Sequence, residues 1–434
     1  MNKKTILYVR TDIYNKKLIA GGSVTHTIGV IEGFIAHGYS VVCASSVMLE
    51  HLERCALTAL QPLQNPKIFS FLRWKINCLL SNIFFTYTIF QFSKKYSLDF
   101  IYQRSGMLNC SGLIVSKFRK IPLILEYNGS EVWLEKYCSS QKWFKGTYFI
   151  GMWEALTLRR ADYVIVVSQA LKGELISRKV NAHKILVNPN GVNTQIFDPK
   201  VLENHRSRIR NELHLNDKFV FGFVGTFSIW HGIEVLAKIA PLIIERHPEA
   251  HFIFIGDGPL LDFLKQELTK AHVTDASVTY TGLLPAHESK QYLAVCDAFL
   301  SPNQPNSDDS RFFGSPTKLF EYLSMGKPII ASNMEQITEI VSPAYIFNGA
   351  VQEFDLEPVD KHVGYVINPG NEIGFVHTAS HLIKMPVLDR LKMGDNARAR
   401  AVDKYGWHEH VNKIISFVTE NSLSKGVTHD FAAM

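Results

Sequence analysis

Short apolar runs alternate with helix-length segments along most of the chain, and this alternation limits the possible fold more than any other feature. The runs are TILYV, SVVCAS, FIYQR, PLILEYN, YVIVVS and KILVNPNG in the first half, and FVFGFVG, HFIFIGDG, SVTYTGLL, AFLSP, PIIAS and GYVINPG in the second. Apolar strands separated by helices are the βαβ pattern of a parallel sheet. The pattern stops near residues 195–215 and then restarts. The sequence therefore predicts two Rossmann-like α/β domains facing a cleft, with ligands at the carboxyl ends of the strands.

Composition narrows the class of protein. A chain of 434 residues is long enough for two cores. Its 46 Lys and Arg against 40 Asp and Glu give a net charge of +6 without a long block of like charge, which favours an anionic ligand or a membrane surface over nucleic acid. The six cysteines are widely spaced, which is not typical of a zinc site or a disulfide framework. With neither a secretion signal nor an apolar stretch of about 20 residues, we expect a cytoplasmic protein.

Residues 68–92 lie in a segment rich in phenylalanine, with Arg73, Trp74 and Lys75 near its start and Lys94 and Lys95 just beyond its end. This composition is typical of a helix at the surface of an anionic membrane, which would place the protein peripherally at the inner face. A buried helix of the first domain with solvated ends is an equally good interpretation.

Glycines follow several predicted strands, where a backbone without side chains can approach a ligand closely. Gly21 and Gly22 precede a predicted helix that carries His26, although a plain turn into that helix explains them equally well. In the second half, Gly225, Gly256 and Gly258 follow two successive strands. These loops would border the cleft.

The segment FFGSPTKLFEYLSMGKPIIAS predicts a loop, a helix and a strand, and it carries the strongest signal for a ligand. Gly314, Ser315 and Pro316 lead into the helix, whose N-terminal N–H groups suit a diphosphate. Lys318 adds a cation in the first turn, which is unfavourable there unless an anion is bound. Glu321 follows one turn later, and its carboxylate could accept hydrogen bonds from ribose hydroxyls. The alternative is an exposed ion pair between these two residues.

In its motifs and their order, the chain resembles the retaining nucleotide-sugar glycosyltransferases of family 4, which have the GT-B fold. The segments that carry the resemblance are GGSVTHTIGVIEGFIAHGYSV, ADYVIVVSQALKGEL, ILVNPNGVNTQIFDP, FVGTFSIWHGIEVL, FIFIGDGPL, TGLLP, SPTKLFEYLSMGKPIIAS and GYVINPGN. The resemblance implies an acceptor domain at residues 1–200, a donor domain at 201–406 and a helix at 407–420 that crosses back to the first domain. Residues 421–434 are expected to be a disordered tail.

The chain departs from the family's donor clamp, which is a pair of glutamates separated by seven residues together with an arginine and a lysine. Glu321 matches the second glutamate, but the first falls on Phe313, the arginine on Thr226 and the lysine on His231. Our hypothesis is that Lys318 replaces the missing cation, with Arg311 as a helper. The family's histidine on the acceptor side is absent.

The resemblance implies a hexosyltransferase (EC 2.4) that moves a sugar from a UDP- or GDP-sugar to a glycan or lipid-linked acceptor, in surface polysaccharide synthesis. Lys318 and His231 would stabilise the leaving diphosphate without a metal or other cofactor. Glu126 would orient or deprotonate the acceptor hydroxyl, unless its role at the strand end is structural. The expected donor-binding residues are Gly21, Gly22, Gly225, Thr226, Gly256, Gly258, Leu283, Phe313, Gly314, Ser315, Thr317, Lys318, Leu319 and Glu321, and His26, Asn128 and Glu131 are expected on the acceptor side. A nucleotide-sugar epimerase and a non-catalytic partner in a glycan-assembly complex remain alternatives.

Overall fold

The computed structural model describes residues 4–11, 17–18, 21–46, 48–49, 57–59, 70–137, 147–306, 308, 310–347 and 361–424. Contacts within the chain divide it into two compact units. The first unit consists of Met1–Ile19, Thr27–Pro189 and Trp407–Met434, and the second of Ala20–His26 and Asn190–Gly406.

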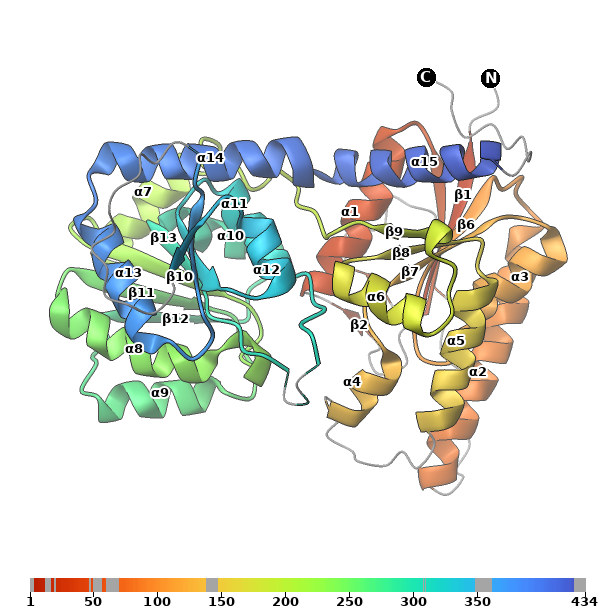
Figure 1. Cartoon of the computed structure of the whole chain (residues 1–434), viewed down its shortest axis with the longest axis horizontal. Helices are drawn as coiled ribbons and strands as arrows, with labels where there is room; N and C mark the ends of the chain where they lie inside the picture. Colours follow the sequence, from red (N-terminus) through yellow and green to blue (C-terminus); the bar gives the residue numbers. More distant parts are fainter. Residues whose placement is uncertain are drawn as a thin grey trace. The chain divides into compact units, whose positions relative to one another are not determined.

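The first unit is built on a parallel sheet that has seven strands among the described residues, in the order β5-β3-β1-β6-β7-β8-β9 (Figure 1). The six predicted strands of the first half are all present. Near its centre, β1 pairs with β3 on one side and β6 on the other, so the chain changes winding direction there, which is where open sheets of this kind bind ligands. The strands are β1 (Thr5–Arg10), β3 (Ser40–Ser45), β5 (Leu57–Ala59), β6 (Phe100–Arg104), β7 (Leu123–Tyr127), β8 (Tyr163–Val166) and β9 (Ile185–Val187), while β2 (Lys17–Leu18) and β4 (Met48–Leu49) pair separately.

Helices cover both faces of this sheet (Figure 1), and this is why a strand such as β7 is buried along its whole length. Helix α2 packs against α3, and α4 packs against α5. The helices are α1 (Gly22–Ala36), α2 (Ser70–Ser93), α3 (Ser111–Arg119), α4 (Glu131–Tyr137), α5 (Thr147–Arg160), α6 (Gln169–Ser177) and α15 (Trp407–Ser424), with a short 3-10 turn η1 (Ala182–Lys184).

The last helix, α15, belongs to the first unit, as predicted for residues 407–420. Its first residue, Trp407, lies against Gly29 of α1, where an added Cβ would come within 2.0 Å of the indole ring. At its other end, the hydroxyls of Ser422 and Tyr163 are 2.6 Å apart. The predicted start of a disordered tail at residue 421 is therefore wrong, because the buried Ser422 keeps the helix on the sheet as far as Ser424. Residues 425–434 lie outside the described residues.

The second unit has a parallel sheet that also shows seven strands among the described residues, in the order β12-β11-β10-β13-β14-β16-β15. All six predicted strands are present. The strands are β10 (Phe219–Val224), β11 (Ala250–Ile255), β12 (Val278–Gly282), β13 (Ala298–Ser301), β14 (Ile329–Ser332), β15 (Tyr345–Phe347) and β16 (Gly364–Ile367).

Two apolar clusters form the core of the second unit, and helices lie on both faces of its sheet (Figure 1). One cluster includes Leu319, Phe320 and Leu323 of α11, and the other includes Leu236 of α8. The helices are α7 (Glu203–Glu212), α8 (Ile233–Arg246), α9 (Leu261–Lys270), α10 (Ala286–Val295), α11 (Thr317–Ser324), α12 (Glu335–Val341), α13 (Glu372–Lys384) and α14 (Val387–Tyr405), with the 3-10 turn η2 (Ile229–His231).

The segment after Pro189 belongs to the second unit, so the change between units comes earlier than the predicted 200/201. The backbone N–H of Asn190 donates to Ser315 Oγ over 3.1 Å. The Arg398 guanidinium of α14 donates to the carbonyls of Thr194 and Phe197 and to the Asp198 carboxylate. These polar contacts within the second unit fix a segment that the sequence alone presents as a loop.

Candidate active site

Three glycines at the carboxyl ends of β10 and β11 let two loops pack closely. Gly225, Gly256 and Gly258 have φ values of +150°, +125° and +155°, which favour glycine. A Cβ on Gly256 would lie 2.0 Å from the Gly225 carbonyl oxygen, and one on Gly258 would lie 2.6 Å from the Phe227 nitrogen. These contacts give the glycines a structural role, and their predicted role in donor binding stays a prediction.

Lys318 lies in the first turn of α11 and is only 5% exposed. Its Nζ stands 4.2 Å from the centre of the Phe223 ring and has no hydrogen-bond partner among the described residues. Burial lowers the pKa of Lys318 to about 7, although the Glu321 carboxylate acts in the opposite direction. A buried ammonium without a partner is unfavourable, so this position favours an anionic ligand.

Glu321 follows Lys318 by one turn and is half-buried. Burial raises the pKa of Glu321 to about 7, and the Lys318 charge partly offsets this. Since Lys318 Nζ makes no hydrogen bond within the described part of the chain, the pair is not the exposed ion pair that the sequence left open. Each charge stabilises the other at a distance.

His231 ends the turn η2 and lies close to the carboxyl end of β10. Its Nδ1 contacts the Thr226 carbonyl, and because a carbonyl only accepts, Nδ1 carries the proton. Burial, and then the Lys318 charge, lower the pKa of His231 to about 3. The imidazole is therefore neutral near pH 7, so it cannot replace a cation of the donor clamp, although it can still form hydrogen bonds.

A hydrogen bond from a backbone N–H to a tyrosine hydroxyl positions α11, and with it Lys318, beside the end of β10. The backbone N–H of Val224 donates to the Tyr322 hydroxyl over 2.8 Å. The Tyr322 ring stacks on Phe299 with the ring centres 4.2 Å apart. Both contacts connect α11 to strands β10 and β13, so the first turn of the helix lies beside the end of β10.

The predicted donor residues around the start of α11 differ in accessibility. Ser315 is buried, and its hydroxyl and carbonyl both accept hydrogen bonds from Asn190. Leu319 is fully buried and its N–H donates to the Pro316 carbonyl, so neither its side chain nor its N–H is available to a nucleotide-sugar donor. By contrast, Phe313, Gly314 and Thr317 are half-buried, Thr226 is exposed, and Leu283 is 65% exposed after β12.

A cavity of about 480 Å³ opens beside the loop that precedes α11. Arg311 and Phe312 of this loop contribute to its wall, together with Asn333 and Glu335 at the start of α12. Arg311 Nε lies 3.5 Å from a Glu335 oxygen. The predicted role of Arg311 as a helper cation stays a prediction.

In the first unit, Glu126 is the residue before the end of β7 and is 1% exposed. Its carboxylate accepts hydrogen bonds from the Tyr102 hydroxyl at 2.7 Å, from Arg104 at 2.6 Å and from the Asn128 amide at 2.5 Å. A carboxylate with three donors is well stabilised as an anion, which suits positioning of its neighbours better than proton abstraction. The predicted catalytic role of Glu126 stays a prediction.

Two arginines at neighbouring strand ends were not predicted as site residues. Arg10 ends β1, is 3% exposed, and donates to the Thr27 hydroxyl of α1 over 2.7 Å. Arg104 ends the adjacent strand β6 and pairs with Glu126. A signal existed in the sequence, because TILYVR and FIYQR both end with a cation at the edge where ligands are expected.

The remaining predicted residues lie at helix starts. Gly21 precedes α1 and Gly22 begins it, and His26 is buried on this helix. Glu131 begins α4, and its N–H donates to Glu154 over 2.8 Å. In the described ranges there is no group of three or more His, Cys, Asp or Glu that could hold a metal ion. No helix of those ranges is both long and apolar enough to cross a membrane.

Comparisons with known proteins agree with this architecture. Residues 20–196 match the model of "Glycosyltransferase Family 4", and residues 218–384 match that of "Glycosyl transferases group 1". The chain is similar to the Anabaena protein Alr3699/HepE, whose crystal structure is a complex with UDP and glucose. The TM-score is 0.67 at 20% identity, covering 96% of this chain and all of that one.

Two curated relatives match this chain over only part of their own length. The sulfoquinovosyl transferase SQD2 of Arabidopsis thaliana is 25% identical over 74% of this chain and 56% of its own length. The alpha-monoglucosyldiacylglycerol synthase of Streptococcus pneumoniae is 22% identical over 58% of this chain and 56% of its own. The chain thus spans little more than half the length of these two relatives.

Two parallel-sheet α/β units, with a final helix returned to the first, define the GT-B fold of glycosyltransferases. Within that class, the two matched models together cover most of the sequence. The chain belongs to glycosyltransferase family 4.

Proposed function

We propose that this protein is a retaining hexosyltransferase that uses a UDP- or GDP-sugar as donor and a glycan or a lipid-linked glycan as acceptor. The observation that carries the proposal is Lys318, a buried cation without a hydrogen-bond partner in the described chain, at the N-terminal turn of a helix on the ligand-binding edge of the second sheet. A diphosphate would supply the missing anion and would also meet the positive end of the helix dipole.

Each group at this edge has a role in the proposed reaction. Lys318 and the first turn of α11 stabilise the negative charge that develops on the leaving diphosphate. Glu321, one turn further on, accepts hydrogen bonds from the ribose hydroxyls. Neutral His231 contributes a hydrogen bond through Nε2, while Nδ1 is held by the Thr226 carbonyl. The site uses these side chains and requires no metal ion.

On the acceptor side, the carboxyl ends of β1, β6 and β7 present Arg10, Arg104 and Glu126. Glu126 holds Arg104 in place, and a fixed cation at this edge suits a phosphate-bearing acceptor. One relative is named as a synthase of a glucosyldiacylglycerol, and another as a sulfoquinovosyl transferase. These names support a glycolipid or a lipid-linked surface-polysaccharide precursor as the acceptor, met at the inner face of the membrane.

The proposal is tested by incubating the protein with a panel of UDP- and GDP-sugars and measuring nucleotide release. Slow release supports transfer or hydrolysis. An isomerised donor would show an epimerase, and tight binding without turnover would show a non-catalytic partner, an alternative favoured by Phe313, Thr226 and the neutral His231 at the clamp positions.

The matched variants are Lys318→Met and Lys327→Met. Lys327 is half-buried and its pKa is lowered by burial, but it precedes β14, at the opposite edge of the sheet. If nucleotide release falls in Lys318→Met and persists in Lys327→Met, the activity is assigned to the site around Lys318.

A further inference from the structure

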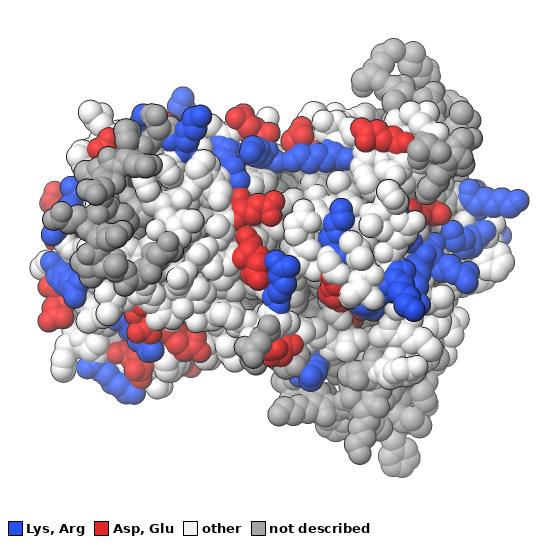
Figure 2. Space-filling model, in the orientation of Figure 1, with Lys and Arg blue, Asp and Glu red and all other residues white. Residues whose placement is uncertain are grey.

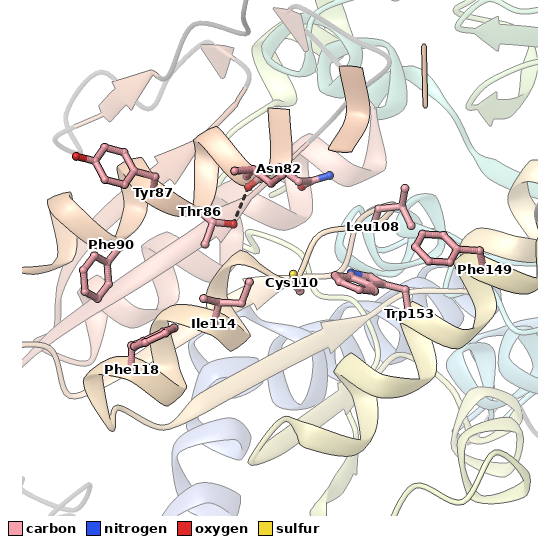
Figure 3. A pocket seen from close by; sticks show the side chains of 11 residues that line it. Asn82, Thr86, Tyr87, Phe90, Leu108, Cys110, Ile114, Phe118, Phe149 and Trp153 are labelled. Carbon is pink, nitrogen blue, oxygen red and sulfur yellow. Dashed lines mark hydrogen bonds between the residues drawn. The ribbon is translucent and has the colours of Figure 1, made fainter. Parts of the chain in front are cut away.

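The first unit contains an apolar cavity of about 510 Å³ that has no part in the proposed reaction (Figure 3). Helices α2, α3 and α5 and the loop between β6 and α3 form its walls. Its volume lies within the roughly 300–1,000 Å³ of typical ligand sites. The described residues that line it include no charged side chain: Asn82, Ile83, Thr86, Tyr87, Phe90, Leu108, Cys110, Ile114, Phe118, Phe149 and Trp153.

The cavity wall is almost entirely apolar, although it includes a few polar side chains such as Asn82 and Thr86. The Thr86 hydroxyl donates to the Asn82 carbonyl of its own helix over 2.6 Å, as the dashed line in Figure 3 shows. Phe90 and Phe118 meet edge to face with ring centres 6.0 Å apart at one end, and Phe149 and Trp153 line the other (Figure 3). The cavity therefore offers dispersion contacts and almost no hydrogen bonds, as a hydrocarbon requires.

The cavity opens onto an apolar surface. Phe118 is 75% exposed and Tyr87 61% exposed, although both line the wall. Further exposed apolar side chains continue the surface along the same helices: Ile83 and Phe84 on α2, Ile114 on α3, and Tyr148, Phe149 and Met152 on α5. Exposed apolar surface on this scale is typical of an interaction site.

Positively charged side chains lie beside one end of the cavity. The Lys94 ammonium lies 4.4 Å from the centre of the Phe90 ring, and Arg119 donates to Ser93 over 3.3 Å. Lys95 and Lys120 are also exposed at the ends of α2 and α3, and Lys117 there pairs with Asp162. Figure 2 shows lysines and arginines gathered on the side of this unit where α3 lies. The charge complements an anionic surface beside the apolar opening.

We propose that this cavity receives a hydrocarbon chain of an anionic bilayer phospholipid, and that α2, α3 and α5 dock the first unit on the membrane. The rigid aromatic walls hold the chain, while the cations around Lys94 face the lipid phosphates. This assignment goes beyond the proposed transfer reaction and does not depend on it. The sequence left open whether residues 68–92 form a helix on a membrane surface or a buried helix. In this proposal α2, which spans most of that segment, forms one wall of a lipid site. The side chains of Arg73, Trp74 and Lys75 lie outside the described part.

Docking is tested by co-sedimentation with phosphatidylcholine vesicles that contain or lack phosphatidylglycerol. We expect binding to the anionic vesicles, about fivefold weaker for each charge removed in Lys94→Gln and Lys95→Gln, and at least about tenfold weaker in Phe118→Ser. The matched controls are Ile176→Ser, on an exposed residue of α6, and Lys200→Gln in the second unit. Equal binding by Phe118→Ser and Ile176→Ser, or equal binding to both kinds of vesicle, would refute the proposal.

Insertion of the chain is tested by fluorescence quenching. Vesicles whose acyl chains are brominated should quench Trp153, and the Trp153→Phe variant, which keeps the wall aromatic, should lose that part of the quenching. Quenching that is the same in both proteins would exclude a chain in the cavity. Tight binding of a monomeric alkyl phosphate without vesicle binding would instead assign the cavity to a soluble or carrier-linked chain and overturn membrane docking.

Discussion

Replacing Lys318 by methionine should make the free protein more stable and its nucleotide binding weaker. The pKa of Lys318 falls from 10.5 to about 7, which corresponds to a destabilisation of at most about 5 kcal/mol for the buried ammonium. Methionine has a similar volume, so the substitution should add little packing cost. A gain of even about 1 kcal/mol would raise the Tm of a domain of this size by about 2–4 °C.

The same substitution removes the cation that a diphosphate would meet. A charge-assisted hydrogen bond contributes about 1.5–3 kcal/mol, so we expect UDP or GDP to bind roughly 10- to 150-fold more weakly. Scanning calorimetry of the free protein and titration calorimetry with each nucleotide measure the two effects separately. Lys327→Met is the control, with unchanged nucleotide affinity.

The pH dependence adds an internal check. Between pH 10.5 and 7 the unfolded chain binds the Lys318 proton that the native protein releases, so the free energy of unfolding should fall as the pH is lowered through this range and then level off. This part of the slope should vanish in Lys318→Met. If the variant loses stability and nucleotide affinity together, Lys318 is a structural group and our inference is wrong.

Other substitutions test neighbouring groups. Glu321→Gln should weaken nucleotide binding by about 1.5–3 kcal/mol, and unchanged affinity by calorimetry would exclude the contact with ribose. Phe313 is half-buried, and Phe313→Glu should improve activity with a fully hydroxylated hexose donor relative to a deoxy or N-acetylated one; a variant that only unfolds would contradict this. Gly256→Ala should destabilise the second unit by several kcal/mol, since its Cβ would lie 2.0 Å from the Gly225 oxygen, and a denaturation midpoint equal to that of the parent would refute the packing argument.

The strands of both sheets were predictable because strands buried on both faces are continuous apolar runs. Two strands at sheet edges were not predicted: β5 has three residues, and β15 also has three, of which Ile346 is 55% exposed. Such short strands are fixed by the neighbour to which they pair and carry little signal of their own.

The sequence indicates where Lys318 and Glu321 lie but not how they are protonated. The order of strands and helices places both residues near the carboxyl ends of the strands of the second sheet. Their shifted pKa values arise from burial, and Lys318 lies over the Phe223 ring, whereas His231 is neutral because it is enclosed next to Lys318. These effects come from residues far apart in sequence, as does the network in which Arg104 holds Glu126.

The position of α15 has a consequence for biosynthesis. The ribosome completes residues 27–189 early, but the Gly29 surface of α1 that accepts Trp407 stays uncovered until residues 190–406 have also been made. The second unit, almost continuous in sequence, can therefore mature before the first. A message that is cut short between Pro189 and Trp407 leaves the first unit without its last helix, although residues 27–189 have already been translated.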